Sequence, residues 1–203
     1  MTDSDLPLFD VVMRQRAPRE LLPDPVPEAL IERVLEAGTH APSAMNGQPW
    51  HFVVVQDAAT RQKIADGARA AWLGFARDRS SDQQAPGFKA VDRWAMGGLA
   101  QAPVIIVLCG DTERLPLEQM GSSIFPAAQN ILLAANALGL GSLMSNLPLF
   151  APDGAFAEAL DLPEHIVPLA TLPIGYPAKK LGRPRRRPVA EVTSRDRYGN
   201  AWS

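Results

Sequence analysis

The sequence is poor in cysteine and contains no long apolar run. Its single cysteine, Cys109, excludes an internal disulfide and a CxxC pair for a metal or redox centre. No stretch approaches the roughly 20 apolar residues that span a bilayer, and the acidic N-terminus lacks the apolar core of a signal peptide. We therefore expect a cytoplasmic protein with no membrane segment, in which Cys109 is a buried thiol at the end of a strand.

Several motifs that carry catalysis are missing as well. No GxGxxG follows an apolar strand, no GxxxxGK(S/T) phosphate loop occurs, and there is no GxSxG elbow. The histidines His40, His51 and His165 do not have the spacing of zinc ligands, so we expect no metal site. Any chemistry must therefore come from a bound organic cofactor.

Charge of either sign is not in excess over the chain as a whole. The formal net charge is −2, with 46% hydrophobic and 21% charged residues, which is typical of a globular protein. The 203 residues suffice for one domain that spans the whole chain. The run 179–187 is strongly basic, and alone it is compatible with a solvated tail or a nucleic-acid-binding stretch. The low overall charge argues against nucleic acid as a partner.

Apolar periodicity and turn residues predict strands that are separated by helices, and hence a mixed layer of helices and sheet. The predicted helices are Leu6–Arg16, a second from about Pro27 to Gly38, Arg61–Phe75, Val91–Leu99, Ser122–Leu138 and the short Asp153–Leu160. The predicted buried strands are Phe52–Val55, Val104–Leu108 and Val167–Ile174. The stretch Ala76–Gly87 is polar and is expected to be exposed or mobile.

Two segments stand out by their apolar content. The helix Ser122–Leu138 is apolar almost all round, which predicts a central, buried helix. The tail 175–203 has too few apolar residues to pack on itself. We therefore expect it to lie as an arm along another surface, such as that of a partner subunit.

Three further segments are candidates for binding a ligand. The arginines of Arg14–Arg19 suit a phosphate, or form a solvated helix end. The loop His40–Trp50 offers backbone amides, a hydroxyl and carboxamides to a planar heterocycle, or is a rigid connector between helix and strand. The turn Gly139–Ser145 allows close approach of the backbone to a ligand, or caps the preceding helix.

Taken together and in order, these segments resemble the nitroreductase family of FMN enzymes over nearly the whole chain. The most specific match is 41–50, Ala-Pro-Ser-Ala-Met-Asn-Gly-Gln-Pro-Trp, which is similar to the family's Ala-Pro-Ser-x-x-Asn-x-Gln-Pro-Trp. Residues 16–21 with Pro25-Val26-Pro27 resemble its N-terminal pattern, and 127–142 its central helix and following turn. Residues 175–177 and 186–192 resemble its C-terminal signature.

The resemblance implies an α+β fold with a mixed sheet flanked by helices, a long buried central helix and an extended C-terminal arm from about 175 to 203. It further implies a homodimer with two FMN sites at the interface. The FMN-binding residues that it implies are Arg16, Ala17, Arg19, Pro42, Ser43, Asn46, Gln48, Leu143, Met144, Arg185, Arg186 and Arg187. Of these, the arginines, with Ala17 through its backbone, would hold the phosphate or the ribityl chain, and the others would lie along the flavin ring or support it.

The activity that the resemblance implies is an FMN-dependent oxidoreductase. NADH or NADPH would reduce the flavin at N5 and leave, and a small electron-poor acceptor such as a nitroaromatic or a quinone would then take its place in a ping-pong cycle. No catalytic side chain is required. Three features depart from the family pattern: Ala17 stands where a serine is common, Leu21 stands where a phenylalanine is usual, and the segment 74–100 matches nothing specific. The physiological acceptor is therefore left open.

Other functions remain as alternatives. A reductive dehalogenase and a dimethylbenzimidazole synthase would share the fold and FMN, although Asn46 is not expected in the synthase pattern. A non-catalytic flavin-binding protein would hold FMN without turnover. A nucleic-acid-binding module that uses the basic tail is the most distant alternative.

Overall fold

The architecture is built on a four-stranded sheet within the described residues, which are 7–79 and 82–202 of a computed structural model. The strands are β1 (Trp50–Val55), β2 (Val104–Asp111), β3 (Gly141–Ser142) and β4 (Ile166–Gly175), in the order β1-β2-β4-β3. The three strands that the sequence predicts are present. The two-residue β3 was not predicted, because its glycine-rich sequence indicates a turn.

Each described strand pairing is antiparallel, which corrects the expectation of a mixed sheet. The reason lies in the connection between β1 and β2. The helices of this connection bring the chain back to the end of β1 at which it left the sheet. Val55 therefore lies opposite Ile105, and β2 runs antiparallel to β1. The class of the fold, helices around one sheet, is confirmed.

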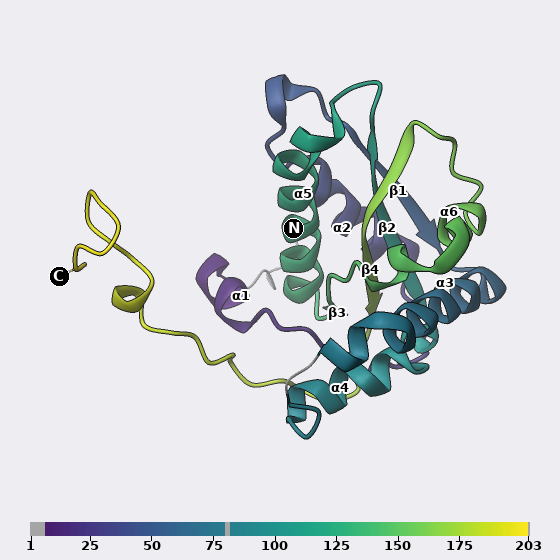
Figure 1. Ribbon diagram of the computed structural model, residues 1–203, viewed down its shortest axis with the longest axis horizontal. Coiled ribbons are helices and arrows are strands. Elements are labelled where there is room, and N and C mark those ends of the chain that lie inside the picture. The colour runs from purple at the N-terminus through teal and green to yellow at the C-terminus, as the bar shows by residue number, and fades with distance from the viewer. Residues whose placement is uncertain (1–6, 80–81, 203) are drawn as a thin grey trace.

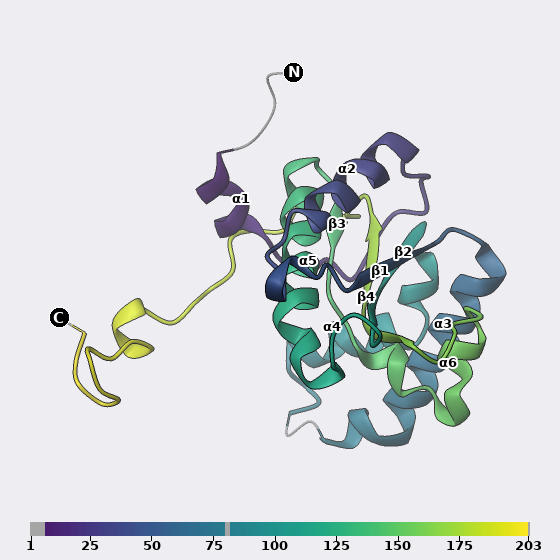
Figure 2. The same ribbon diagram turned by 90° about the horizontal axis from the view of Figure 1, so that it is seen from above.

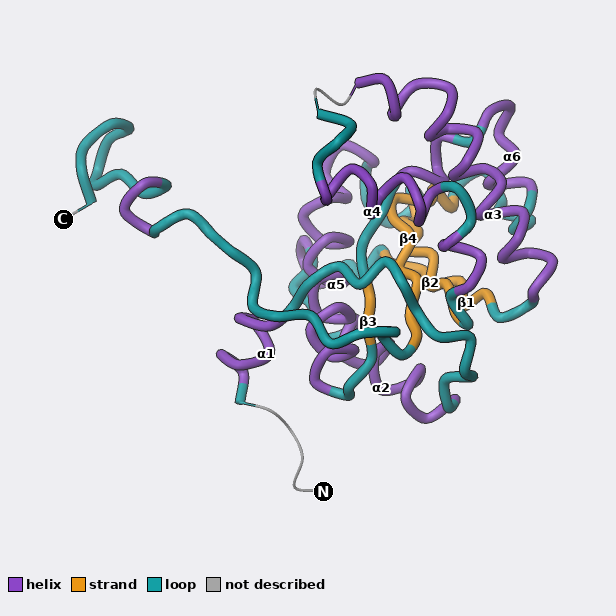
Figure 3. Tube along the Cα trace, turned by 90° about the horizontal axis from the view of Figure 1, so that it is seen from below, coloured by secondary structure: helices purple, strands orange, loops and turns teal. Residues whose placement is uncertain are grey.

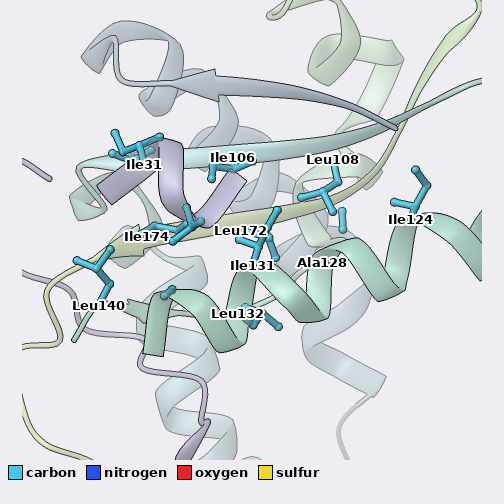
Figure 4. Close-up of a cluster of buried hydrophobic side chains, with 14 of the residues drawn as sticks. Ile31, Ile106, Leu108, Ile124, Ala128, Ile131, Leu132, Leu140, Leu172 and Ile174 are labelled. Carbon is cyan, nitrogen blue, oxygen red and sulfur yellow. The ribbon is translucent and has the colours of Figure 1, made fainter. Parts of the chain in front are cut away.

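Both faces of β2 are buried because helices cover the sheet on both sides. Alternate residues of a strand point to opposite faces. Val104, Ile106 and Leu108 pack against α2 (Glu28–Thr39) and α5 (Leu117–Ala137), as Figure 4 shows for the α5 side. Ile105, Val107 and Cys109 face α3 (Ala58–Ala71), α4 (Pro86–Ala95) and the short α6 (Ala155–Glu158), which lie together on the other side in Figure 3.

Cys109 is buried, as the sequence predicts, at the position where an apolar strand approaches its end. Burial raises the pKa of its thiol to about 12. The thiol is therefore protonated and inert at neutral pH.

The long helix α5 is buried on one face and open on the other. Its buried face includes Met120, Ile124 and Ile131, whereas Ser122, Phe125 and Gln129 are exposed along the opposite stripe. The prediction of a central, buried helix therefore holds for one face of α5 in a single chain and not for the other. The helix also begins five residues earlier than predicted, directly after Pro116, and it ends before Gly139, whose φ is +78°.

The N-terminal helix and the C-terminal arm lie outside this body. Figures 1 and 2 show α1 (Leu8–Arg14) and the segment from about residue 182 projecting from the side of the molecule that carries α5. The apolar stripe predicted for α1 is exposed at Leu8, Phe9, Val12 and Met13. Val11 is buried instead, and its carbonyl accepts a hydrogen bond from Asn136 Nδ2 at 2.9 Å.

The segment between β1 and β2 differs most from the prediction. The predicted helix Arg61–Phe75 is α3 followed by a π-helical turn, Trp72–Ala76. The next helix, α4, begins at Pro86 and not at Val91, since a proline suits the first turn of a helix. Within the described ranges, no helix combines the length and apolar character that a bilayer crossing needs.

Candidate functional site

The arginine segment that follows α1 runs beside the chain that leaves β4. Leu22 N–H donates to Tyr176 O at 2.8 Å, and Ala178 N–H donates to Glu20 O at 3.0 Å. Leu21 and Pro177 form an antiparallel bridge. These backbone bonds bring together two basic segments, 14–19 and 179–183, that are far apart in the sequence.

A cleft of about 290 Å³ lies where these segments meet the end of α5, and it is called the α5 cleft below. It is lined by Arg14, Gln15, Arg16, Pro18, Leu132, Asn136, Gly139, Leu140, Gly141, Ser142, Pro177, Lys179, Lys180 and Leu181. Its lining, as far as the structure describes it, includes four basic side chains and no acidic one. The α5 cleft is therefore suited to an anion.

Two arginines at this place have no carboxylate partner among the described residues. Arg16 donates only to the carbonyl of Gly182, at 3.2 Å. Arg19 is half-buried, and burial lowers its pKa from the usual value. Arg14 and Lys179, by contrast, pair with Asp10 at 3.9 Å and with Glu20 at 2.9 Å. A half-buried guanidinium without a counter-ion is unfavourable, so this geometry favours an anionic ligand at Arg19.

Two small residues of β3 complete the α5 cleft. A side chain at Gly141 would meet Pro18 Cγ at 2.7 Å, so the glycine allows the arginine segment to lie against β3. Ser142 is 4% exposed, and its hydroxyl makes no hydrogen bond to the described residues. Every fully buried side-chain nitrogen or oxygen in the described part has a partner. The Ser142 hydroxyl must therefore reach solvent, and it lines this cleft.

A second cleft, of about 250 Å³, lies on the other side of the arginine segment, and it is called the α4 cleft below. Its lining residues are Arg16, Ala17, Pro18, Arg19, Glu20, Pro86, Gly87, Ala90, Arg93, Lys179 and Leu181. The two clefts share Arg16, Pro18, Lys179 and Leu181, and thus flank one stretch of backbone.

The loop with Pro42, Ser43, Asn46 and Gln48 is held in a strained conformation. Met45, Asn46 and Gln48 have φ values of 49°, 55° and 47°, in the left-handed region. The Ser43 hydroxyl accepts from Gln48 N–H at 3.1 Å, and Gln48 Nε2 donates to Asn46 Oδ1 at 3.3 Å. Such strain persists where the surroundings impose it, and it is typical of ligand-binding loops.

This loop and the arginine segment lie at different ends of α5. Ala44 N–H donates to Ser123 Oγ at 3.2 Å, near the beginning of the helix, whereas the α5 cleft includes Asn136, near its end. At 1.5 Å per residue the two positions are about 20 Å apart along the helix axis. One chain therefore does not bring its loop together with its own Arg16 and Arg19.

The other predicted site residues are placed as follows. The side chain of Leu143 is buried in the core on the α3 side, so that only its backbone is available to a ligand, whereas Met144 is 47% exposed. Ala17 lines the α4 cleft. Arg185, Arg186 and Arg187 are exposed on the arm and line neither cleft, and Arg186 donates to the carbonyl of Arg185 at 3.1 Å.

Some residues of the clefts were missed from the sequence. Lys179 and Lys180 belong to the basic run 179–187, and their charge could have nominated them. Ser142 lies in the nominated turn 139–145, but its side chain was not singled out, because its place in a cleft depends on the pairing of β3. Arg93 gave no signal, because its place depends on the packing of α4. One group with metal-ligand atoms within 4.8 Å of one another, Asp111, Glu113 and His165, lies outside both clefts.

Comparisons with known proteins identify the family of the chain and similar folds. A family model described as "Nitroreductase family" matches residues 12–176. A protein of Methanothermobacter thermautotrophicus, provisionally named NADH dehydrogenase/NAD(P)H nitroreductase, is 31% identical over 88% of this chain and 82% of its own length. A 5,6-dimethylbenzimidazole synthase of Rhodospirillum rubrum is 30% identical over 90% of this chain and 95% of its own length.

A solved structure is similar over nearly the same range. It is that of a provisionally named nitroreductase from Desulfovibrio desulfuricans in complex with FMN. The TM-score is 0.72 and the identity 26%, over 95% of this chain and 98% of the other. The likeness thus extends over almost all of both chains.

Proposed function

This chain belongs to the nitroreductase family, and from that membership we infer that it is an FMN-dependent oxidoreductase supplied with hydride by NAD(P)H. We propose further that it passes the electrons to a small electron-poor acceptor, such as a nitroaromatic or a quinone. FMN, when bound, supplies the redox chemistry, because its flavin ring exchanges a hydride with one substrate and electrons with the other. The task of the protein is to bind and orient the cofactor.

The observation that carries this function is the pair of arginines without counter-ions. A phosphate monoester brings a charge of about −1.5 to −2 and three acceptor oxygens. Arg16 is exposed at the α5 cleft, and Arg19 is half-buried without a carboxylate partner in the described chain. An arginine fork binds such a phosphate through two hydrogen bonds at once. The residues present therefore fit the phosphate end of FMN.

The loop 42–48 fits the other end of the cofactor. Pro42, Ser43 and Asn46 would lie along the flavin ring, and Gln48 supports them through its bond to Asn46 Oδ1. Nothing in this loop is charged, which suits an uncharged ring. Leu143, through its backbone, and Met144, through its exposed side chain, would contact the ring from the turn after α5.

A homodimer would bring the two ends together. If two chains pack the open faces of α5 against each other in opposite directions, the loop of each chain meets the arginine segment of its partner. Phe125, 44% exposed on that face, and the exposed apolar side chains of α1 are suited to such an interface. Each site would then take residues from both chains.

The arm would serve the same assembly. It projects from the side that carries α5, and its apolar residues Val189 and Val192 are exposed. Laid along a partner, it would bring Arg185, Arg186 and Arg187 toward a bound phosphate and add positive charge there. Ala17 would contribute its backbone only.

No acid or base from the protein is assigned to the reaction. The hydride donor and the acceptor would each use the same place beside the bound cofactor in turn, as in a ping-pong sequence. The residues of the chain hold the ring still and keep its exposed face accessible.

The visible spectrum of the purified full-length protein tests this function first. We expect a flavin spectrum, release of FMN at about one per chain, and bleaching within a stopped-flow mixing experiment with NADH or NADPH. A protein that binds no added FMN would contradict the proposal. A protein that holds FMN, but is reduced by neither nucleotide, would be a flavin-binding protein without this activity.

A further inference from the structure

The two clefts carry more positive charge than one phosphate neutralises. Within the described residues, they are lined by six cationic side chains and a single carboxylate. The cations are Arg14, Arg16, Arg19, Arg93, Lys179 and Lys180, and the carboxylate is that of Glu20. A phosphate monoester contributes about −2 at most. The excess positive charge indicates a second anionic group at the same place.

One of these cations, Arg93, lines only the α4 cleft, where it is held by a fixed helix. Trp72 Nε1 and Arg77 Nε both donate to Asp92 Oδ1, at 2.8 and 3.2 Å, and so tie α4 to the end of α3. Trp94 is buried in the core below. Arg93 therefore lies between two residues, Asp92 and Trp94, that are fixed to the rest of the fold. Its guanidinium is therefore presented at the cleft from a defined position, although the side chain itself is mostly exposed.

Lys179 and Arg93 both line the α4 cleft, and Glu20 contacts both. The carboxylate accepts a hydrogen bond from Lys179 at 2.9 Å and pairs with Arg93 at 3.4 Å. Lys179 first, and Arg93 to a smaller extent, lower the pKa of Glu20, which therefore stays ionised. A guanidinium has five donors and an ammonium three, so both cations keep donors for a ligand. Glu20 thus positions two cations without satisfying them.

We propose that the α4 cleft binds a phosphate group of the hydride donor, with Arg93 and Lys179 as its ligands. This inference rests on the proposed function, because the donor is a pyridine dinucleotide. Two sources of the phosphate are compatible with the cleft: the diphosphate that NADH and NADPH share, and the 2′-phosphate that NADPH alone carries. Arg19, which the proposed function assigns to FMN, also lines this cleft, so a nucleotide bound here would lie next to the cofactor.

The test uses the FMN-loaded full-length protein and its Arg93→Gln variant. Calorimetry gives the Kd values of NADP⁺ and NAD⁺, which bind without reducing the flavin, and flavin fluorescence gives the Kd of FMN. Arg69→Gln is the matched control, because Arg69 is also exposed on a helix and lines neither cleft. Arg93→Lys keeps the charge and is expected to retain part of the nucleotide affinity.

We expect Arg93→Gln to weaken nucleotide binding about tenfold, since a charged hydrogen bond contributes about 1.5 kcal/mol or more. The Kd of FMN should not change in Arg93→Gln. In Arg69→Gln, the Kd values of FMN and of both nucleotides should equal those of the wild type. Weakening of NADP⁺ alone would assign the cleft to the 2′-phosphate, and weakening of both nucleotides would assign it to the diphosphate.

Three results would overturn the inference. If Arg93→Gln binds both nucleotides with unchanged affinity, the α4 cleft does not bind a phosphate of the hydride donor. The proposed function is not affected by this result. A large loss of FMN affinity in the same variant makes the cleft part of the cofactor site instead of a second one. Wild-type protein that takes up no FMN contradicts the proposed function, and this inference falls with it.

Discussion

The two ends of α5 carry regions of opposite character. The α5 cleft is rich in positive charge, and its cations are presented by backbone that pairs with the strand-end segment 176–178. The loop 42–48 has no charged residue, and three of its residues have positive φ without being glycine. The α5 cleft would bind a ligand through its charge, and its backbone conformation is ordinary. The loop would bind a ligand through its shape, and its backbone is strained. FMN has the same polarity, with a charged phosphate at one end and a flat, uncharged ring at the other.

The comparison teaches that neither region is a site by itself. The cationic cleft would hold any small anion, and the loop would hold any flat polar ring with little affinity. Specificity for a cofactor with both features requires both regions at one place, which one chain does not provide. The predictions below separate the contributions of the two ends, beginning with the largest expected effect.

Removal of both unpaired arginines should have the largest effect. Arg16→Gln with Arg19→Gln removes charged hydrogen bonds of about 2 kcal/mol each, so FMN affinity should fall about a thousandfold. Flavin fluorescence titration measures it, with Arg69→Gln as the control. If the double variant binds FMN as tightly as the wild type, these two arginines do not bind the phosphate.

A charge on the open face of α5 should separate the chains. Phe125→Asp places a carboxylate in the proposed interface, and its desolvation costs several kcal/mol, so that we expect a monomer and a loss of FMN affinity of about 100-fold. Light scattering gives the mass, and circular dichroism shows whether the helices remain. A folded monomer that keeps full FMN affinity would show that one chain is sufficient.

Loss of the Ser142 hydroxyl should have a smaller effect. Ser142→Ala removes one hydrogen bond to a charged oxygen, so FMN affinity should fall about tenfold. Ala17→Ser in the same chain should restore part of it, because that position carries a serine in the family pattern. If Ser142→Ala and the wild type bind FMN with equal affinity, the Ser142 hydroxyl contacts only water.

The smallest effect is expected at the other end of α5. Gln48→Ala removes a solvent-exposed hydrogen bond to Asn46 worth about 0.5–1 kcal/mol, and FMN affinity should fall about threefold. Gln56→Ala is the control, since Gln56 is also exposed and lies beyond the end of β1. A loss as large as that of the arginine variants would show that the loop dominates binding.

The fold was predictable where residues are buried on a regular pattern. The continuous apolar run of β2 indicated a strand covered on both faces, and the periodicity of 122–138 indicated the main helix. The sequence could not indicate that α5 leaves one face open. An apolar residue such as Phe125 gives the same sequence pattern in a core as at an interface. The start of α4 differs from the prediction, because Pro86 and Gly87 are typical of loops and here belong to the first turn of the helix.

The candidate site was predictable in its parts and not in its arrangement. Arg16, Arg19 and the loop 42–48 were nominated by composition and by resemblance to a family. Their separation along α5 depends on the packing of Ala44 against Ser123, which no local pattern encodes. The turn 139–145 was nominated for its backbone, and the role of the Ser142 side chain depends on where β3 lies beside the arginine segment. Arg93 was not nominated, because its place depends on the packing of α4.

Subunit complementation tests the central claim, a site shared between two chains, most directly. One variant carries Arg16→Gln and Arg19→Gln, and the other carries Ser43→Ala and Asn46→Ala. Each alone should bind little FMN. After unfolding and joint refolding in equal amounts, half of the dimers are mixed and each has one intact site, so that about a quarter of the wild-type FMN binding should return. If the mixture binds no more FMN than its components, the two regions do not form one site across chains.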